Sequence, residues 1–317
     1  CLSMDKNQLL VKEIGSMTSN SLPEIPDSRS ENFHGQLIEF GRFLERECRP
    51  GGRHDLKNWP NAVWHKIIER MLLGLNEFMS YSSPEPVLLQ WYNSGVLVKV
   101  AGKILAFDVL PVPRYYNWPE PQGLTDKLAE IIDVLAITHA HADHFDEKLA
   151  ARCAELGKPV LMPVGAIESF SGITVLGNGK MFKCGPVSLK AHRACHVWRD
   201  NPDDVATATF EVCAADNFSM VFCGDSDYTK DLSVITSQPD LMFITWRNPG
   251  PEYEDGHPAQ QACTTDAVNL AIAKFAPRQL VLEHYAELDH IYKGFSASYE
   301  MAIDLIKNLQ VPTRIHF

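Results

Sequence analysis

The chain has 317 residues, of which 45% are hydrophobic and 22% charged, a composition typical of soluble globular proteins. Its formal net charge of −11 argues against the broad positive field of a nucleic-acid-binding or anionic-membrane-binding protein and leaves room only for a local basic pocket. No apolar run approaches the roughly twenty residues that span a bilayer. The eight cysteines are scattered without a Cys-x-x-Cys pair, which is typical of a reducing compartment. We therefore expect a cytoplasmic protein without a disulfide framework.

Three regions follow one another along the chain. Residues 1–30 are polar and punctuated by Ser, Asn and Pro, so we expect a flexible leader. Residues 31–86 contain two helical patterns, in which apolar residues recur at three- and four-residue steps. Two helices alone bury too little apolar surface to form a domain, so we predict a helical extension packed on the body. This extension is also a candidate surface for homo-oligomer formation, or a roof over a site.

Residues 87–317 are predicted to form the main, catalytic domain. Short apolar or alternating runs joined by turn residues predict antiparallel strands at its start, at 87–91, 95–100 and 103–107. Residues 110–125 form a predicted loop rich in proline and aromatic residues. Further strands are predicted at 160–162, 173–176, 187–191, 206–213, 219–223, 241–245 and 279–283, with helices at 147–156, 265–275 and 296–308. Antiparallel runs of strands with interposed helices indicate an α/β sandwich of two sheets with helices outside.

One short stretch concentrates metal-ligand residues. His139, His141, Asp143 and His144 follow directly after the apolar run 133–137, which reads as a buried strand. Residues two apart in an extended segment point the same way, so His139 and His141 can bind one ion together. Asp143 and His144 come where the chain turns into a helix and reach a second ion. Imidazole and carboxylate suit zinc, iron or manganese, so we favour a metal site over a histidine-rich polar loop.

Three later strand ends carry further ligand-type residues. The first offers His192 and His196, either of which suits a metal, although His192 is equally well explained as a hydrogen-bonding histidine inside the strand. The second ends in Gly-Asp, and glycine lets the backbone turn so that Asp225 projects over the strand end. Asp227 is the alternative ligand there, or else a helix cap. The third places His284 after a strand. Two histidines lie in loops without a preceding strand and are less well placed: His257 and His290.

Together, the motif His139-x-His141-x-Asp143-His144 and the three ordered strand ends resemble the metallo-β-lactamase-fold superfamily of metal-dependent hydrolases, over residues 87–290. The resemblance implies a four-layer αββα sandwich and two divalent cations, most often zinc, with manganese or iron as alternatives. It assigns His139, His141 and His196 to the first cation. It assigns Asp143, His144 and His284 to the second, with Asp225 bridging the two. Asp108 matches the aspartate that usually orients a ligand histidine.

The residues around Asp225 and His284 are most similar to the ascorbate-6-phosphate lactonase-like branch, which also resembles N-acylphosphatidylethanolamine phospholipase D enzymes. This implies a hydrolase in which a metal-bridging hydroxide attacks an ester, lactone or phosphodiester bond of a small substrate, phosphorylated in some of these enzymes. Asp143 and Asp225 are the expected catalytic residues. Candidate residues for substrate binding are Arg193, Arg247, Tyr285 and Asn93, with Arg114 and Arg199 also near predicted site loops.

Two other functions fit the same pattern less well. Iron also suits these ligands, so an iron-dependent redox or oxygen-chemistry enzyme on the same fold is the main alternative. The intact motif differs from the substituted motif of the flavodiiron branch, and the sequence shows no flavin domain. A nuclease is less favoured because the net charge is negative and no nucleic-acid-binding domain is visible.

Overall fold

The computed structural model describes residues 32–48, 62–82, 84–92, 94–112, 118–168, 170–197, 201–215, 217–230, 235, 238–245, 261–284, 299–309 and 313–314. The polar leader predicted over residues 1–30 lies outside these ranges. So do seven residues considered above: Asn93, Arg114, Arg199, Arg247, His257, Tyr285 and His290.

The first sheet has six strands in sequence order. They are β1 (Val87–Gln90), β2 (Val96–Val100), β3 (Lys103–Phe107), β4 (Val134–Ala136), β5 (Val160–Pro163) and β6 (Ile173–Leu176). Strands β1, β2 and β3 pair antiparallel, as predicted. From β3 to β6 the pairing is parallel; α4 (Leu124–Ile131) connects β3 to β4, and α5 (Glu147–Glu155) connects β4 to β5.

The second sheet has seven strands in the order β13-β12-β11-β10-β9-β8-β7. They are β7 (Met181–Cys184), β8 (Val187–Ala194), β9 (Thr207–Ala214), β10 (Ser219–Phe222), β11 (Leu241–Thr245), β12 (Gln279–Glu283) and β13 (Thr313–Arg314). Pairing is antiparallel from β7 to β10 and parallel from β10 to β13. Helices α6 (Gln261–Phe275) and α8 (Tyr299–Ile306) accompany the parallel part. The predicted antiparallel character therefore holds for only part of each sheet.

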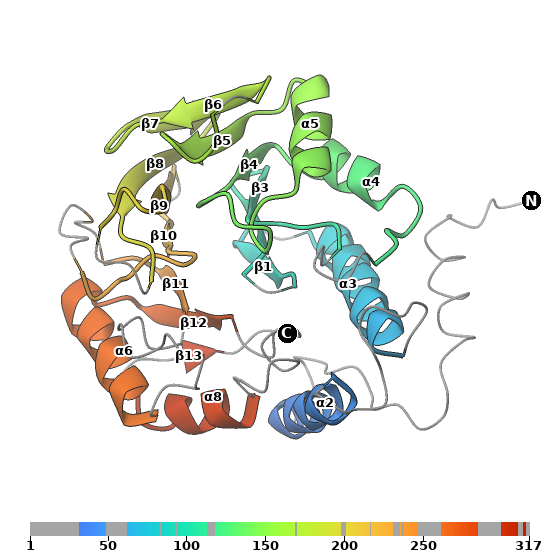
Figure 1. Ribbon diagram of the computed structural model, residues 1–317, viewed down its shortest axis with the longest axis vertical. Helices are drawn as coiled ribbons and strands as arrows, with labels where there is room; N and C mark the ends of the chain where they lie inside the picture. Colours follow the sequence, from blue (N-terminus) through green and yellow to red (C-terminus); the bar gives the residue numbers. More distant parts are fainter. Residues whose placement is uncertain are drawn as a thin grey trace, which may run out of the picture.

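The two sheets face each other across an apolar core, and helices cover their outer faces (Figure 1). Phe107 on the first sheet stacks on Phe222 of the second, with ring centroids 4.9 Å apart. Phe210 and Phe243 extend this aromatic layer along the second sheet. Helices α4 and α5 lie outside the first sheet, and α6 and α8 lie outside the second. The predicted four-layer αββα sandwich is confirmed.

Two N-terminal helices, α2 (Phe33–Cys48) and α3 (Ala62–Ser80), pack onto this sandwich. Helix α2 lies against α8, and α3 lies against β1 (Figure 1). The Trp64 ring N–H donates to the carbonyl of Pro119 at 3.2 Å, and the Lys99 ammonium donates to the carbonyl of Phe78 at 2.7 Å. The division of the chain into a helical extension and a main domain, and a role of the extension in joining two copies, stay predictions. Among the described residues, no helix is long and apolar enough to cross a membrane.

Three of the described elements were not predicted: α4, β7 and the two-residue strand β13 at the end of the second sheet. Helix α4 begins at Leu124, inside the predicted loop 110–125, and buries Leu124, Leu128 and Ala129. Its single buried stripe is only two turns long and follows a proline-rich run, so its helical period is hard to detect. Strand β7 was also missed. Its side chains alternate between half-buried and exposed at the sheet edge, so it lacks the apolar run that identifies a buried strand.

Candidate metal centre

The predicted ligands converge at one edge of the sandwich, where β4, β8, β10 and β12 end. Backbone contacts link these strand ends. The Val197 N–H donates to the Asp225 carbonyl at 2.8 Å, and the Asp227 N–H donates to the Cys195 carbonyl at 2.8 Å. The Ala208 N–H donates to the Thr138 carbonyl at 3.0 Å, which ties the histidine motif of the first sheet to the second sheet.

A first group of ligand atoms comes from His139, His141, His196 and Asp225, and these atoms all lie within 4.8 Å of one another. The Nε2 atoms of His196 and His139 are 3.3 Å apart. Asp225 Oδ2 lies 3.4 Å from His196 Nε2 and 3.9 Å from His139 Nε2. Four lone-pair atoms thus surround a common point, as tetrahedral coordination requires.

A second group comes from Asp143, His144 and His284, whose ligand atoms also lie within 4.8 Å of one another. His144 Nε2 is 3.5 Å from Asp143 Oδ2. Asp225 reaches this group too, because its Oδ1 lies 2.8 Å from His284 Nε2 and its Oδ2 lies 3.5 Å from His144 Nε2. A single carboxylate therefore lies between the two groups.

Charge and burial act in opposite directions on this cluster when no cation is bound. Burial lowers the pKa of His139 well below its ordinary value, and the neighbouring His144 lowers it further. Burial also acts to lower the pKa of His144, but the carboxylates of Asp143, Asp225 and Asp108 outweigh it and raise that pKa well above the ordinary value. Burial acts to raise the pKa of Asp225, and the surrounding histidines overcome it and hold this pKa well below its ordinary range. The cluster is therefore strongly coupled electrostatically.

Three buried side chains orient the ligand histidines from behind. His144 Nδ1 lies 2.7 Å from Asp108 Oδ2 and 3.1 Å from Ser94 Oγ. The Thr138 hydroxyl donates to Asp108 Oδ2 at 2.5 Å and lies 3.0 Å from His139 Nδ1. The Thr138 N–H donates to Asp108 Oδ1 at 2.7 Å. A carboxylate that accepts the Nδ1 hydrogen of a histidine leaves the Nε2 lone pair for a cation.

The backbone is held in unusual conformations at this edge. Asp108 and His284 have positive φ values of 48° and 57°, which cost roughly 1–2 kcal/mol for a residue with a Cβ. Such conformations concentrate at functional sites. Gly224, at φ 50°, lets the chain turn before Asp225. A Cβ at Gly224 would lie only 2.6 Å from Thr138 Oγ1, so glycine is also needed for close packing.

The two alternative ligands make other contacts. His192 is fully buried, and its Nε2 lies 2.9 Å from Glu211 Oε2, so it is a hydrogen-bonding histidine of the sheet. Asp227 Oδ1 accepts hydrogen bonds from the Thr229 N–H at 3.0 Å and from the Thr229 hydroxyl at 2.5 Å. Neither residue belongs to the two ligand groups.

Several solved structures share this architecture. A protein from Veillonella parvula named as a possible metal-dependent hydrolase is 14% identical, with a TM-score of 0.54, over 71% of this chain and 94% of that one. A metallo hydrolase from the archaeon Ignicoccus hospitalis is 17% identical, with a TM-score of 0.51, over 73% of this chain and 95% of that one. No protein-family model and no curated protein matches the sequence.

A variant of CmlA β-hydroxylase is also similar, with 17% identity and a TM-score of 0.52 over 75% of this chain. CmlA is described as a diiron β-hydroxylase from Streptomyces venezuelae. This chain spans about half of CmlA, covering 53% of its length. At identities this low, the similarity shows the fold alone, and it agrees with the two sheets and the ligand edge described above. The chain has the metallo-β-lactamase fold.

Of the candidate substrate residues, Arg193 is the one that the structure describes. In this metallo-β-lactamase fold, Arg193 lies at the end of β8. Its guanidinium pairs with the carboxylate of Asp203, and its backbone N–H donates to Asn178 Oδ1 at 3.0 Å. Asn93, Arg247 and Tyr285 lie outside the described residues, so their role in substrate binding stays a prediction.

Sequence reasoning missed Ser94 and Thr138. Thr138 directly precedes the histidine motif, and its position beside His139 was a usable signal. Ser94 was interpreted only as part of a hairpin turn. No spacing in the sequence links it to His144, fifty residues later.

Proposed function

We propose that the chain is a dinuclear metal-dependent hydrolase. The observation that carries this proposal is the pair of ligand groups that share the carboxylate of Asp225. A second observation concerns the fit of a cation. His144 Nε2 is buried and has no hydrogen-bond partner among the described residues, as expected for an atom that binds a metal ion.

We assign the ligands as follows. His139, His141 and His196 would hold the first cation, Asp143, His144 and His284 would hold the second, and the Asp225 carboxylate would contribute to both. Imidazole and carboxylate donors in this number suit two zinc ions best, and they also suit manganese or iron. We infer that Asp108 fixes the tautomer of His144, because its Oδ2 faces the Nδ1 atom at 2.7 Å.

Hydrolysis follows from these positions. When bound, two such cations lower the pKa of a water molecule toward about 7 and polarise the bond under attack. Asp143 is half-buried, and its Oδ2 lies 3.5 Å from His144 Nε2; in this proposal its carboxylate orients the attacking water and accepts its proton. Asp225 keeps the two ligand groups at a fixed separation. The proposed substrate is a small molecule with an ester, lactone or phosphodiester bond. The proposal includes substrates that carry a phosphate group.

An iron-dependent oxygen chemistry is the second candidate. The observation that favours it is the similarity to CmlA, which is described as a diiron β-hydroxylase. The same histidine and carboxylate donors suit iron. The two candidates differ in the metal that the protein retains and in whether dioxygen is consumed.

Metal analysis followed by an activity panel tests the proposal. Protein purified without added metal is expected to hold about two equivalents of zinc or manganese per chain and to hydrolyse at least one of a phosphodiester, lactone and ester panel. Asp225→Asn is expected to lose the metal and the activity. Asp227→Asn is the matched control, because Asp227 bonds to Thr229 and belongs to neither ligand group. Stoichiometric iron with a redox-sensitive visible spectrum, together with oxygen consumption, would overturn the hydrolase assignment in favour of the second candidate.

A further inference from the structure

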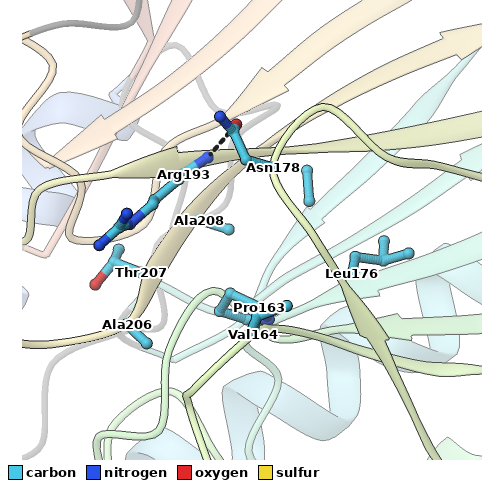
Figure 2. A pocket seen from close by; sticks show the side chains of 9 residues that line it. Pro163, Val164, Leu176, Asn178, Arg193, Ala206, Thr207 and Ala208 are labelled. Carbon is cyan, nitrogen blue, oxygen red and sulfur yellow. Dashed lines mark hydrogen bonds between the residues drawn. The ribbon is translucent and has the colours of Figure 1, made fainter. Parts of the chain in front are cut away.

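A pocket lies between the two sheets and is lined by residues of both (Figure 2). Its empty volume is about 300 Å³, including the part open to solvent. The first sheet contributes Pro163 and Leu176, and the second contributes Ala191 and Ala208. No residue of this pocket belongs to the ligand groups, so it is a separate feature of the same edge.

Strand directions place the pocket at the metal edge. Pro163 and Leu176 end β5 and β6, which run parallel to β4, and the histidine motif follows β4. Opposite them, Arg193 lies near the end of β8, three residues before His196. Neighbouring strands are about 4.8 Å apart, so the ends of β5 and β6 lie one and two strand spacings, roughly 5 and 10 Å, from β4. A substrate that spans this distance contacts both the pocket and the cluster.

The pocket is open because its lining residues are small. Ala191 and Ala208 are almost fully buried, with 1% of each surface exposed, and both point into the space between the sheets. Ala206 also lines the pocket and lies next to Gly165. A Cβ added to Gly165 would lie 3.5 Å from the Cβ of Ala206. Replacement of any of these alanines by a longer side chain fills the space.

The lining is mainly apolar, and its one charge is already paired. Arg193 extends along the entrance (Figure 2), and its guanidinium binds the carboxylate of Asp203. Asn178 Oδ1 accepts a hydrogen bond from the Arg193 backbone N–H, which fixes the backbone beside the pocket. Because the guanidinium has a carboxylate partner, the arginine contributes its aliphatic stem to the wall rather than a free positive charge. An apolar group therefore complements this pocket better than an anionic one.

We propose that this pocket binds a short branched alkyl or phenyl substituent of the substrate and thereby sets substrate selectivity. This inference rests on the proposed hydrolase function and adds the substrate class to it. The substituent lies on the side of the scissile bond that points toward Leu176 of β6. Its size is limited by Leu176 and Pro163 on one sheet and by the alanines on the other.

The test measures kcat/KM of metal-loaded protein with two matched substrate series of increasing chain length. These are p-nitrophenyl esters from acetate to 3-methylbutanoate, and alkyl p-nitrophenyl phosphates from methyl to 3-methylbutyl. Burial of each added methylene is expected to raise kcat/KM by up to about fourfold. Ala206→Leu is expected to abolish this dependence, so that kcat/KM no longer rises with chain length. Ala273→Leu, on the exposed face of α6, is the matched control and keeps the dependence. A length dependence that survives in Ala206→Leu overturns the proposal.

A binding measurement separates this proposal from the function on which it rests. If the metal-loaded protein hydrolyses neither series, the proposed function is wrong for esters and phosphodiesters. Binding to the pocket is then measured by saturation-transfer NMR with 3-methylbutanamide and acetamide. Binding of 3-methylbutanamide that Ala206→Leu removes and Ala273→Leu retains supports the pocket. Equal binding to all three proteins, or none to the wild type, overturns it. Tighter binding of acetate than of 3-methylbutanamide, lost in Arg193→Gln, also overturns it, because the occupant is then an anion.

Discussion

The two ligand groups of the candidate metal centre differ in how firmly their histidines are held. In the second group, His144 is fully buried, and its Nδ1 atom faces both the Asp108 carboxylate and the Ser94 hydroxyl. In the first group, His141 is exposed, and His139 Nδ1 faces only the hydroxyl of Thr138 among the contacts described above. Partners that fix ring orientation and tautomer strengthen metal binding. The second site is therefore better preorganised, and the first is more accessible.

This difference gives the two sites different sensitivities to substitution. Asp225 serves both groups, Asp108 reaches one histidine directly and the other through Thr138, and Ser94 reaches one alone. Substitution of Asp225 is therefore expected to affect both sites and substitution of Ser94 only the second, with Asp108 between these two cases. Two readouts resolve it: the number of cations bound per chain, and the affinity of each.

The largest effect is expected for Asp225→Ala. This change removes the carboxylate between the groups and leaves four histidines of the cluster without their common anion. We expect both cations to be lost and hydrolysis to fall by at least about a thousandfold, since metal-dependent activation of water then disappears. Elemental analysis and turnover measure these losses, and circular dichroism checks that the variant is folded. Full metal content with near-normal turnover would show that the assignment of Asp225 is wrong.

A smaller and unequal effect is expected for Asp108→Asn. The asparagine N–H₂ group in place of Oδ2 faces His144 Nδ1 and the Thr138 hydroxyl, which both need an acceptor there. His144 then favours the tautomer that carries its hydrogen on Nε2, and that atom no longer binds a cation. We expect the affinity of the second site to fall about 10–100-fold, the usual range for an orienting residue. Calorimetric metal titration of the apoprotein resolves the two sites. An equal loss at both would contradict the unequal support proposed here.

The extent to which sequence predicts this site depends on how far apart the contacting residues lie in the chain. The motif from His139 to His144 is contiguous, so its alternation after a strand predicts convergence by itself. His196, Asp225 and His284 also follow strands, and the family resemblance assigns them to the two cations; their ligand atoms lie in the two groups described above. Residue spacing alone left His192 and Asp227 open, because a histidine in a strand shows its hydrogen-bond partner, Glu211, only after the register between β8 and β9 is known.

The fold follows the same rule. The αββα sandwich was predictable because apolar strands dominate it, and the antiparallel start from β1 to β3 is marked by turn residues. The parallel pairing of β3 with β4 was not, since it depends on α4, a helix with one short buried stripe. The pocket beside the metal edge was also beyond prediction. It exists because Ala191 and Ala208 face Leu176 across the sheets, and no pattern within one strand reveals a residue opposite it.

Thr138→Val tests the link between the two groups. Valine has nearly the same shape and fits beside Gly224, but it cannot donate to Asp108 or contact His139 Nδ1 through oxygen. We expect both sites to weaken, by roughly three- to tenfold each, as each loses one orienting hydrogen bond of about 1 kcal/mol. Thr138→Ser retains the hydroxyl and should restore both affinities in the same titration. Weakening confined to one site would mean that Thr138 does not connect the groups.

Ser94→Ala is expected to have the smallest effect and to separate the groups most clearly. The lost hydroxyl lies 3.1 Å from His144 Nδ1, whereas Asp108 Oδ2 remains at 2.7 Å and still fixes the tautomer. We therefore expect a loss of roughly two- to fivefold in second-site affinity, less than one full hydrogen bond, and no change at the first site. The Asp108→Asn Ser94→Ala double variant completes the comparison. If Ser94 acts only through the ring that Asp108 already holds, the serine change adds little once Asp108 is replaced, because residues that share one partner are not additive. Additive losses would instead show that Ser94 stabilises the second site by a route independent of His144.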